Sequence, residues 1–573
     1  MDYKGADMSA MRHTLKRSLR QTLTLCAVTL LAACGGGGGG DAPPPTTTPP
    51  APITKTQLEA ASRLAAQATF GMPFEALEPM ARQGAEGWLV SQFNQPPTYH
   101  NPVIFDIVQR REAGEFDAFE QDIEYLIFSR RLSWWHNTVT ANDQLRQRVA
   151  FALSQIFVVS DNVDTLQVYP FALGTYYDVL LENAFGNFRD LLRDVALSPA
   201  MGLYLSHLNN NRSDPVNNIF PDENFAREVM QLFSIGLFEL EPDGTVITDI
   251  NGDPVPAYDN DDIREFAKVF TGLSFGGANG FFGNEIAPRF DIPMAMFEAN
   301  HEPGEKQLLN GTVIPAGLTG AQDIELAIDN LFNHPNVGPF IGRQLIQRLV
   351  TSNPSPEYVE RVGNAFADNG SGVRGDMRAV IRAVLLDPEA RDPALAPNGG
   401  KLREPVVRYV SMLRQFGATS DDGFIAALGY FIQELTRQHP LSAPSVFNFY
   451  LPDHSPVGEI SDQGLVAPEF EITDANSIVN FPNFVDAILF GDFVTDAPPG
   501  FDAVRLTLEP WEALAADPVA LVDRLETLVT YGTKDAETRA IVESAVAEIE
   551  DPGIRPRAAL YWGLTVPATA VRD

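Results

Sequence analysis

Cysteine is almost absent from this chain of 573 residues, which contains only Cys26 and Cys34. Because both lie near the start, the residues after Cys34 have no thiol for a disulfide bond or a thiolate metal site. The H-E-x-x-H pattern of zinc proteases and the C-x-x-C-H pattern of haem attachment are also missing. The larger part of the chain must therefore be stabilised by its hydrophobic core.

Basic residues are scarce compared with acidic ones. The chain has 41 Lys and Arg residues against 75 Asp and Glu residues, which gives a formal net charge of −34. Such a charge repels phosphate backbones, so we predict that nucleic acid is not a partner. Carboxylates are ligands for hard cations, and a divalent cation is the one cofactor class that this composition favours. The alternative is that the acidic surface serves solubility alone.

Long apolar runs are lacking after residue 34. No stretch in that part of the chain approaches the length of about 18 residues that is typical of a membrane-spanning helix. Thr22 to Leu31 is an apolar run of roughly ten residues, the length of a secretory signal. It follows a segment with four basic residues, Arg12, Lys16, Arg17 and Arg20. We therefore predict that residues 1–33 are a signal peptide.

The end of that segment, Leu31-Ala32-Ala33-Cys34, resembles a bacterial lipoprotein lipobox. The resemblance implies cleavage before Cys34 and attachment of lipid to its thiol and to the new amino terminus. Gly35, rather than an aspartate, follows the cysteine, which in such proteins points to the outer membrane. We therefore predict a protein of the bacterial cell envelope that contacts the membrane through Cys34. An ordinary signal peptide with an incidental cysteine is the alternative.

The remaining chain divides into a tether and a body. Residues 34–55 contain six glycines followed by a Pro- and Thr-rich stretch, a composition typical of an extended linker. From residue 56 to 573, apolar residues recur at helical spacing, which predicts one large, mainly α body with long loops. Strand-like alternation is sparse, and a small irregular β-containing insert is expected near Thr245 to Pro315. Helices are expected at Leu145–Ile156, Asp178–Ala196, Ala226–Phe238, Asp323–Phe332, Pro339–Val350, Met377–Leu386 and Val519–Val529.

Six phrases in order resemble the bacterial domain-of-unknown-function 1800 family. The resemblance implies a secreted, largely helical protein, and the family name assigns no chemistry. Family members are often encoded beside a secreted, sulfatase-like protein of another unknown-function family, which suggests such a protein as a partner. The phrases are RLAAQATFG (63–71), LRQRVAFALSQIFVVS (145–160), AFGNFRDLLRDVALSPAMGLYL (184–205), PDENFAREVMQLFSIGL (221–237), HPNVGPFIGRQLIQRLVTSNPSPEYV (334–359) and APSVFNFYLPDHSPVG (443–458).

The densest group of polar residues begins at Asp222. On a helix, Glu223, Arg227 and Glu228 fall on one side, opposite an apolar face. Two carboxylates in different environments suit acid–base catalysis, and Asp222, Glu223 and Glu228 together suit a hard cation. In the structural alternative, Asp222 caps the helix, Glu223 pairs with Arg227, and an arginine of residues 145–160 (Arg146 or Arg148) neutralises Glu228.

A second candidate is the segment from His301 to Lys306, which we expect to form a loop. His301 is a potential base or metal ligand, and Lys306 is a potential anion-binding group. The resemblance adds to this, since both match a recurrent His…Lys phrase of the family. We hypothesise that both residues reach the same polar cleft as Glu223, Arg227 and Glu228. A surface or hydrogen-bonded histidine is the alternative.

Three weaker candidates complete the set. Asp249, Asn251 and Asp253 have the D-x-N-x-D opening of a calcium loop but lack its closing glutamate, so a plain turn is the alternative. Asp453 and His454 follow an aromatic-rich segment and either line a cleft or are structural. Trp134 and Trp135 form either a sugar-binding platform or, as we expect, part of the core.

Two functional classes remain open on this evidence. The first is an envelope enzyme, a metal-assisted or carboxylate hydrolase that acts on an extracellular polymer. The second is a non-catalytic envelope protein that binds or scaffolds a secreted partner. Clustered carboxylates favour the first class, whereas the large single body is compatible with the second.

Overall fold

The computed structural model describes residues 51–114, 122–283, 288–396, 398–426, 436–491, 500–533 and 536–572. The described residues from 53 to 283 and from 289 to 572 belong to one compact unit. The predicted signal peptide, Cys34 and most of the tether lie outside the described residues. Within the described part, no helix combines the length and apolar character needed to cross a membrane.

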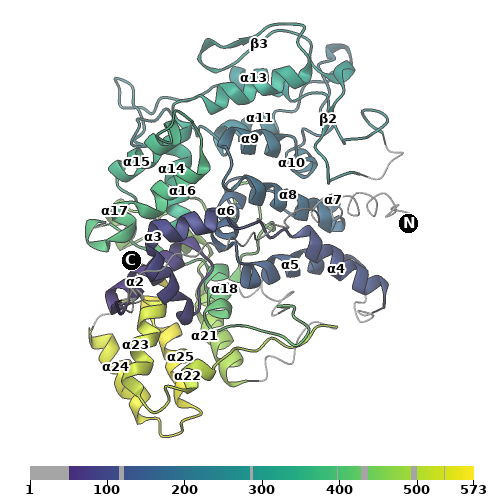
Figure 1. Cartoon of the computed structure of the whole chain (residues 1–573). Coiled ribbons are helices and arrows are strands. Elements are labelled where there is room, and N and C mark those ends of the chain that lie inside the picture. Colours follow the sequence, from purple (N-terminus) through teal and green to yellow (C-terminus); the bar gives the residue numbers. More distant parts are fainter. Residues whose placement is uncertain are drawn as a thin grey trace, which may run out of the picture. The chain divides into compact units, whose positions relative to one another are not determined.

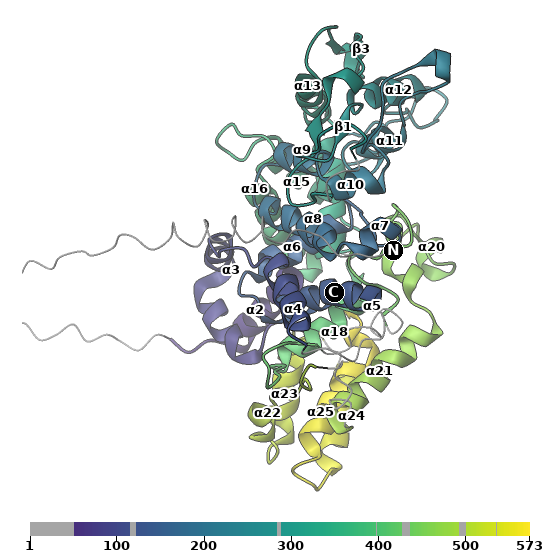
Figure 2. The same ribbon diagram turned by 90° about the vertical axis from the view of Figure 1, so that its right-hand side faces the viewer.

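The compact unit is mainly α-helical, as predicted, and Figures 1 and 2 show its helices following one another along the chain. The described α-helices are α2 (Lys55–Ala68), α3 (Leu77–Phe93), α4 (Asn101–Glu112), α5 (Asp122–Thr140), α6 (Gln144–Ser154), α7 (Asp164–Val168), α8 (Pro170–Asn183), α9 (Phe188–Ala196), α10 (Pro199–Tyr204), α11 (Asn224–Gln231), α12 (Asn260–Val269), α13 (Gly320–Phe332), α14 (Val337–Leu349), α15 (Pro356–Ala367), α16 (Met377–Leu386), α17 (Pro388–Arg391), α18 (Pro405–Gln415), α20 (Glu459–Asp462), α21 (Ala475–Phe490), α22 (Glu509–Glu512), α23 (Pro518–Val529), α24 (Ala536–Glu548) and α25 (Arg555–Thr565).

The predicted β-containing insert is confirmed. Two antiparallel pairs lie in it, β1 (Leu273–Ser274) with β2 (Ala295–Met296) and β3 (Lys306–Gln307) with β4 (Val313–Ile314). A third pair outside the insert joins β5 (Lys401–Leu402) to β6 (Val571–Arg572). The segment from Thr245 to Ile250, which alternates most clearly, forms isolated bridges rather than a continuous strand.

Two predicted helices are shorter than expected. The helix expected over Asp178–Ala196 is broken into α8 and α9, because the side chain of Asn187 caps the first turn of α9 by accepting the amide of Arg189. The helix expected over Ala226–Phe238 ends at Gln231. Gly236 follows with a positive φ of 77°, which turns the chain away from the helical path.

Helix α6 is the most enclosed of the described helices. All eleven of its residues are buried, and they include Gln144, Arg146, Gln147 and Arg148. Trp134 and Trp135 of α5 are buried as well and belong to the main core, as expected. Because α6 brings charged and amide side chains into the interior, the core of this protein must contain a network of polar contacts.

Candidate binding pocket

Helix α14 carries a polar stripe through an apolar environment. Gln344, Gln347 and Arg348 recur at a spacing of three to four residues, so they share one face of the helix. All three are buried, while Ile341, Leu345 and Leu349 belong to the apolar core. The polar face of α14 is therefore directed into the protein and not toward bulk solvent.

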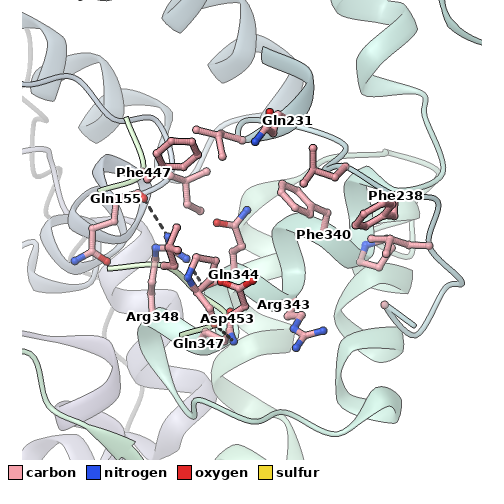
Figure 3. A pocket seen from close by; sticks show the side chains of 18 of the residues that line it. Gln155, Gln231, Phe238, Phe340, Arg343, Gln344, Gln347, Arg348, Phe447 and Asp453 are labelled. Atoms are coloured by element: carbon pink, nitrogen blue, oxygen red, sulfur yellow. Dashed lines mark hydrogen bonds between the residues drawn. The ribbon is translucent and has the colours of Figure 1, made fainter. Parts of the chain in front are cut away.

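This polar face forms one wall of a pocket with a volume of about 420 Å³. The other walls come from the turn after α6, the end of α11 with the segment that follows it, and the loop before α20 (Figure 3). Its volume and mixed lining are typical of sites for small molecules. The lining residues are Gln155, Ile156, Gln231, Leu232, Leu237, Phe238, Leu240, Gly244, Val246, Pro339, Phe340, Arg343, Gln344, Gln347, Arg348, Val446, Phe447, Leu451, Pro452 and Asp453.

The side-chain amide of Gln344 is one of three unpartnered polar groups in the lining, with Gln155 Oε1 and Arg348 Nε, among the described residues. Gln344 is 8% exposed, and its Nε2 has no hydrogen-bond partner among the described residues. Figure 3 shows this amide directed into the space between Phe340 and Phe447, with Gln231 on the far side. A buried donor without a partner costs about 1–3 kcal/mol, and a bound ligand or water with an acceptor atom removes that cost.

Gln347 and Arg348 hold the pocket walls in place. Gln347 Nε2 donates to the carbonyls of Ser352 and Pro452, each at 3.1 Å, which ties the loop before α20 to α14. Arg348 donates to the carbonyl of Gln155 at 3.0 Å and to that of Gln344 at 3.3 Å. Arg348 thereby joins α14 to the segment after α6.

A cluster of buried charges adjoins the pocket at Gln155. The side chains of Gln155 and Gln438 both donate to Glu404, the latter at 2.7 Å. A guanidinium nitrogen of Arg148 lies 3.9 Å from the same carboxylate. Gln155 therefore belongs both to the pocket wall and to this buried network.

The buried cluster contains more cations than carboxylates. Arg148 faces Glu404, and Lys401 contacts Glu469. Arg348 and Arg572, by contrast, have only backbone carbonyls as partners in the described part of the chain. Burial lowers the pKa of Arg348, and it lowers that of Arg572 to about 9. Among the described residues, these two buried guanidinium groups thus have no carboxylate within ion-pair distance, and Glu404 and Glu469 act on Arg348 only from farther away.

The predicted carboxylate helix forms as α11, but its polar residues lie in different environments. Glu223 and Arg227 make the expected i,i+4 ion pair at 3.5 Å, with both side chains about two-fifths exposed. Asp222 is exposed and accepts the amide of Asn224, while Glu223 occupies the N-cap position. The N-cap therefore lies one residue later than the sequence predicted, at Glu223 and not at Asp222.

Glu228 is buried, unlike the exposed pair of Glu223 and Arg227. It is 6% exposed, and its Oε2 has no described hydrogen-bond partner. Burial raises the pKa of Glu228, against the opposing effect of Arg227. The prediction that Arg146 or Arg148 neutralises Glu228 is wrong. Arg146 donates to the carbonyl of Leu181, and Arg148 faces Glu404.

His301 and Lys306 lie together, but their common partner is Asp323 of α13. His301 Nε2 is 3.0 Å from Asp323 Oδ2, and Lys306 Nζ is 2.6 Å from the same oxygen. Lys306 also donates to the carbonyls of Glu302 and Gly304. Both side chains are at most 2% exposed. No described hydrogen bond or ion pair joins them to Glu223, Arg227 or Glu228, so a shared cleft stays a prediction.

The calcium-like residues form a compact exposed turn. Asp249 accepts the backbone amides of Asn251 and Asp253 at 2.8 and 3.0 Å, which lowers the pKa of its carboxyl. These bonds are those of an Asx turn. Over the described ranges, no group of three or more His, Cys, Asp or Glu side chains has an arrangement suited to a metal ion. The divalent cation remains a prediction from composition.

Two catalytic-looking patterns are placed in the wrong structural context. Gly272 to Gly276 has the G-x-S-x-G spacing of a serine-hydrolase elbow, which requires a strand, a sharp turn and a helix. Here Ser274 is buried in β1, its hydroxyl donates to the carbonyl of Phe281, and no helix follows directly. Gly370 to Gly375 has G-x-G-x-x-G spacing but follows helix α15 instead of a strand.

Sequence patterns had indicated only one pocket residue as a cleft candidate. Asp453 lines the pocket, whereas His454 is absent from the lining and lies 3.7 Å from Glu471. Gln344 and Arg348 were missed, although a polar stripe in an otherwise apolar helix is a usable signal. Four of the six family-like phrases, those at 145–160, 221–237, 334–359 and 443–458, supply most of the lining.

Comparison with known proteins identifies a family match over nearly the whole helical body. Residues 63–570 match the family described as "Protein of unknown function (DUF1800)". No curated protein matches the chain, and no solved structure matches it. The match covers every segment that lines the pocket.

Proposed function

Since the chain belongs to the family DUF1800, whose description assigns no activity, we propose a function from the pocket itself. The protein is a lipid-anchored component of the bacterial envelope that binds a small, partly apolar ligand. The observation that carries this proposal is the unpartnered amide of Gln344 in a pocket of about 420 Å³. This function belongs to the non-catalytic class of envelope binding proteins.

The mouth of the pocket supports the same proposal. Leu237, Phe238, Phe447 and Leu451 are large apolar side chains that line the pocket and are exposed. Exposed apolar side chains gathered at a concave site are a common feature of ligand-binding surfaces. From the family resemblance we also propose a sulfatase-like secreted partner. Such a partner would deliver the ligand to the pocket or receive it from there.

Filling the pocket is expected to abolish ligand binding. In Val446→Trp the indole occupies pocket volume, so the affinity for the neutral fluorescent probe N-phenyl-1-naphthylamine should fall at least about tenfold. The measurement is a fluorescence titration of the full chain carrying Cys34→Ser, which needs no detergent. Val457→Trp is the matched control, because Val457 is fully exposed and absent from the pocket lining. Equal affinities of the parent and Val446→Trp would contradict the proposal.

The anchoring part of the proposal has its own test. With an intact Cys34, the protein should enter the detergent phase of a phase-separation assay and label with radioactive palmitate. Cys34→Ser should remove the label and shift the protein to the aqueous phase or leave the signal peptide uncleaved. Cys26→Ser is the control and should change neither property. Detergent partitioning that is unaltered by Cys34→Ser would refute lipid attachment at this residue.

A hydrolase is the second candidate, and Glu228 is the observation that favours it. A buried carboxyl with a raised pKa and an unpartnered oxygen is typical of a general acid. In this alternative Glu228 acts on an extracellular polymer, with Glu223 and Arg227 at the edge of the site. His301 and Lys306 then contribute through their common partner, Asp323.

The two roles of Glu228 predict different results for Glu228→Gln. A carboxyl whose pKa is raised by folding destabilises the protein above that pKa, where its charged form must be buried. We therefore expect Glu228→Gln to raise Tm at pH 7 and to leave it nearly unchanged below about pH 4. If Glu228 is also a general acid, release of reducing ends from envelope polysaccharide should fall at least about 100-fold.

The control for this variant is Glu223→Gln, which changes an exposed ion pair on the same helix. It should alter Tm little at either pH, since exposed pairs contribute about 0–1 kcal/mol. A lower Tm for Glu228→Gln at pH 7 would show that the Glu228 charge is stabilised by a contact. Unchanged polysaccharide release would exclude the hydrolase role for this residue.

A further inference from the structure

We infer that the natural ligand of the pocket carries a carboxylate on an apolar body. This inference rests on the proposed ligand-binding function and specifies the chemistry of the ligand. It combines three observations: unpartnered donors on α14, an excess of buried cations beside them, and an apolar lining over the rest of the pocket.

The donors lie one helical turn apart. Gln344 Nε2 and Arg348 Nε both lack a partner among the described residues, and both side chains belong to the pocket lining. Positions i and i+4 of a helix lie on the same side, which Figure 3 shows for this pair. A carboxylate has two acceptor oxygens and is the group that best matches neighbouring amide and guanidinium donors.

The charge around the pocket favours an anion over a neutral acceptor. Arg348 is buried without a carboxylate within ion-pair distance, and Arg343 lines the same pocket. Asp453 is the one acidic residue of the lining, and it is exposed. In a chain with a net charge of −34, this local excess of positive charge stands out. A buried cation gains most from a desolvated counter-ion.

The body of the ligand must be mainly apolar. Phe340 and Phe447 flank the Gln344 amide, and Leu232, Leu237 and Phe238 extend the apolar lining. Burying apolar ligand surface against such side chains supplies affinity, whereas the few polar groups fix the orientation. The ligand carboxylate would lie against α14, and its alkyl or aryl part would point toward the exposed mouth.

A matched pair of ligands tests this orientation. 4-Phenylbutyrate and 4-phenylbutanol have the same aryl body and differ in charge, and each would displace N-phenyl-1-naphthylamine from the full chain carrying Cys34→Ser. The acid should bind at least about tenfold more tightly than the alcohol at pH 7. Gln344→Glu should weaken the acid at least about tenfold and the alcohol little, because it places a like charge beside the ligand.

Two further variants keep the test decisive if Gln344→Glu folds poorly. Asp453→Asn removes the one acidic group of the lining at an exposed position, so the acid should bind more tightly and the alcohol should not. Gln83→Glu adds the same charge on the exposed surface of α3 and should change neither affinity.

The outcomes separate the inference from the proposed function. Equal affinities for acid and alcohol would overturn the carboxylate inference while the pocket remained a binding site. Tight binding of the acid that neither Gln344→Glu nor Asp453→Asn alters would also overturn it, since the acid would then bind elsewhere. No saturable binding of the dye to the parent chain would contradict both the inference and the proposed function.

Discussion

Replacing Asp323 by alanine is expected to lower the free energy of unfolding by about 4 kcal/mol. Asp323 is the only carboxylate that the described contacts place against Lys306, and both side chains are fully enclosed. Its removal leaves the lysine charge buried with carbonyl partners alone and deprives His301 Nε2 of its partner. Urea denaturation at pH 7, with far-UV circular dichroism as the signal, measures the change.

Two controls test the physical cause. Glu325→Ala on the same helix removes an exposed partner of Arg189 and should cost no more than about 1 kcal/mol. The double variant Asp323→Leu with Lys306→Met removes both charges and should be more stable than Asp323→Ala, because no uncompensated charge remains. If Asp323→Ala costs no more than Glu325→Ala, the buried pair does not stabilise the fold.

Replacing Glu404 by alanine is expected to have an effect of similar size, a loss of about 3–5 kcal/mol. Glu404 accepts hydrogen bonds from Gln155 and Gln438 and is the carboxylate nearest to Arg148. The variant leaves two amide donors and a buried guanidinium unpaired at once. Chemical denaturation measures the loss. The ligand affinity of the folded fraction should fall as well, since Glu404 holds the side chain of Gln155, a residue of the pocket wall whose backbone carbonyl accepts from Arg348.

Glu404→Gln is the graded comparison for this cluster. It keeps the shape and one acceptor oxygen but loses the charge. Its free energy of unfolding should therefore lie between those of the parent and the alanine variant. Glu78→Ala, which breaks an exposed i,i+4 pair with Arg82, should change stability by no more than about 1 kcal/mol. A Glu404→Ala protein as stable as Glu78→Ala would show that water replaces the carboxylate in this cluster.

The helical class and the β-containing insert followed from local sequence patterns. Apolar residues at helical spacing predict a helix wherever one face can be buried, and both α14 and α16 lie where such spacing placed them. The pair Glu223 and Arg227 was also predictable, because residues four apart on a helix are always neighbours. Helix ends were less predictable, as the breaks before α9 and after α11 show.

The fate of individual polar residues was decided by the tertiary structure. A helical wheel gives directions around one helix, but it does not say which direction leads to solvent. It placed Glu223, Arg227 and Glu228 on one side, yet Glu228 is buried while the other two are about two-fifths exposed. Lys306 was predicted to be a potential anion-binding group. The anion that it contacts is the carboxylate of Asp323, which lies 17 residues away in the chain and reaches Lys306 only because α13 packs against the loop.

The pocket is the feature that only the tertiary structure reveals. Gln155 follows the end of α6, whereas Gln231 and Gln344 lie on α11 and α14, many tens of residues apart in the chain. Each glutamine taken alone resembles an ordinary surface amide. The sequence by itself determined the helices on which these side chains stand, because helix formation depends on neighbours in the chain. Packing of α14 against α6, and the approach of the α11 end to the same pocket, decided that they meet, because burial depends on residues that are distant in the chain. It leaves the Gln344 amide facing the pocket without a partner among the described residues.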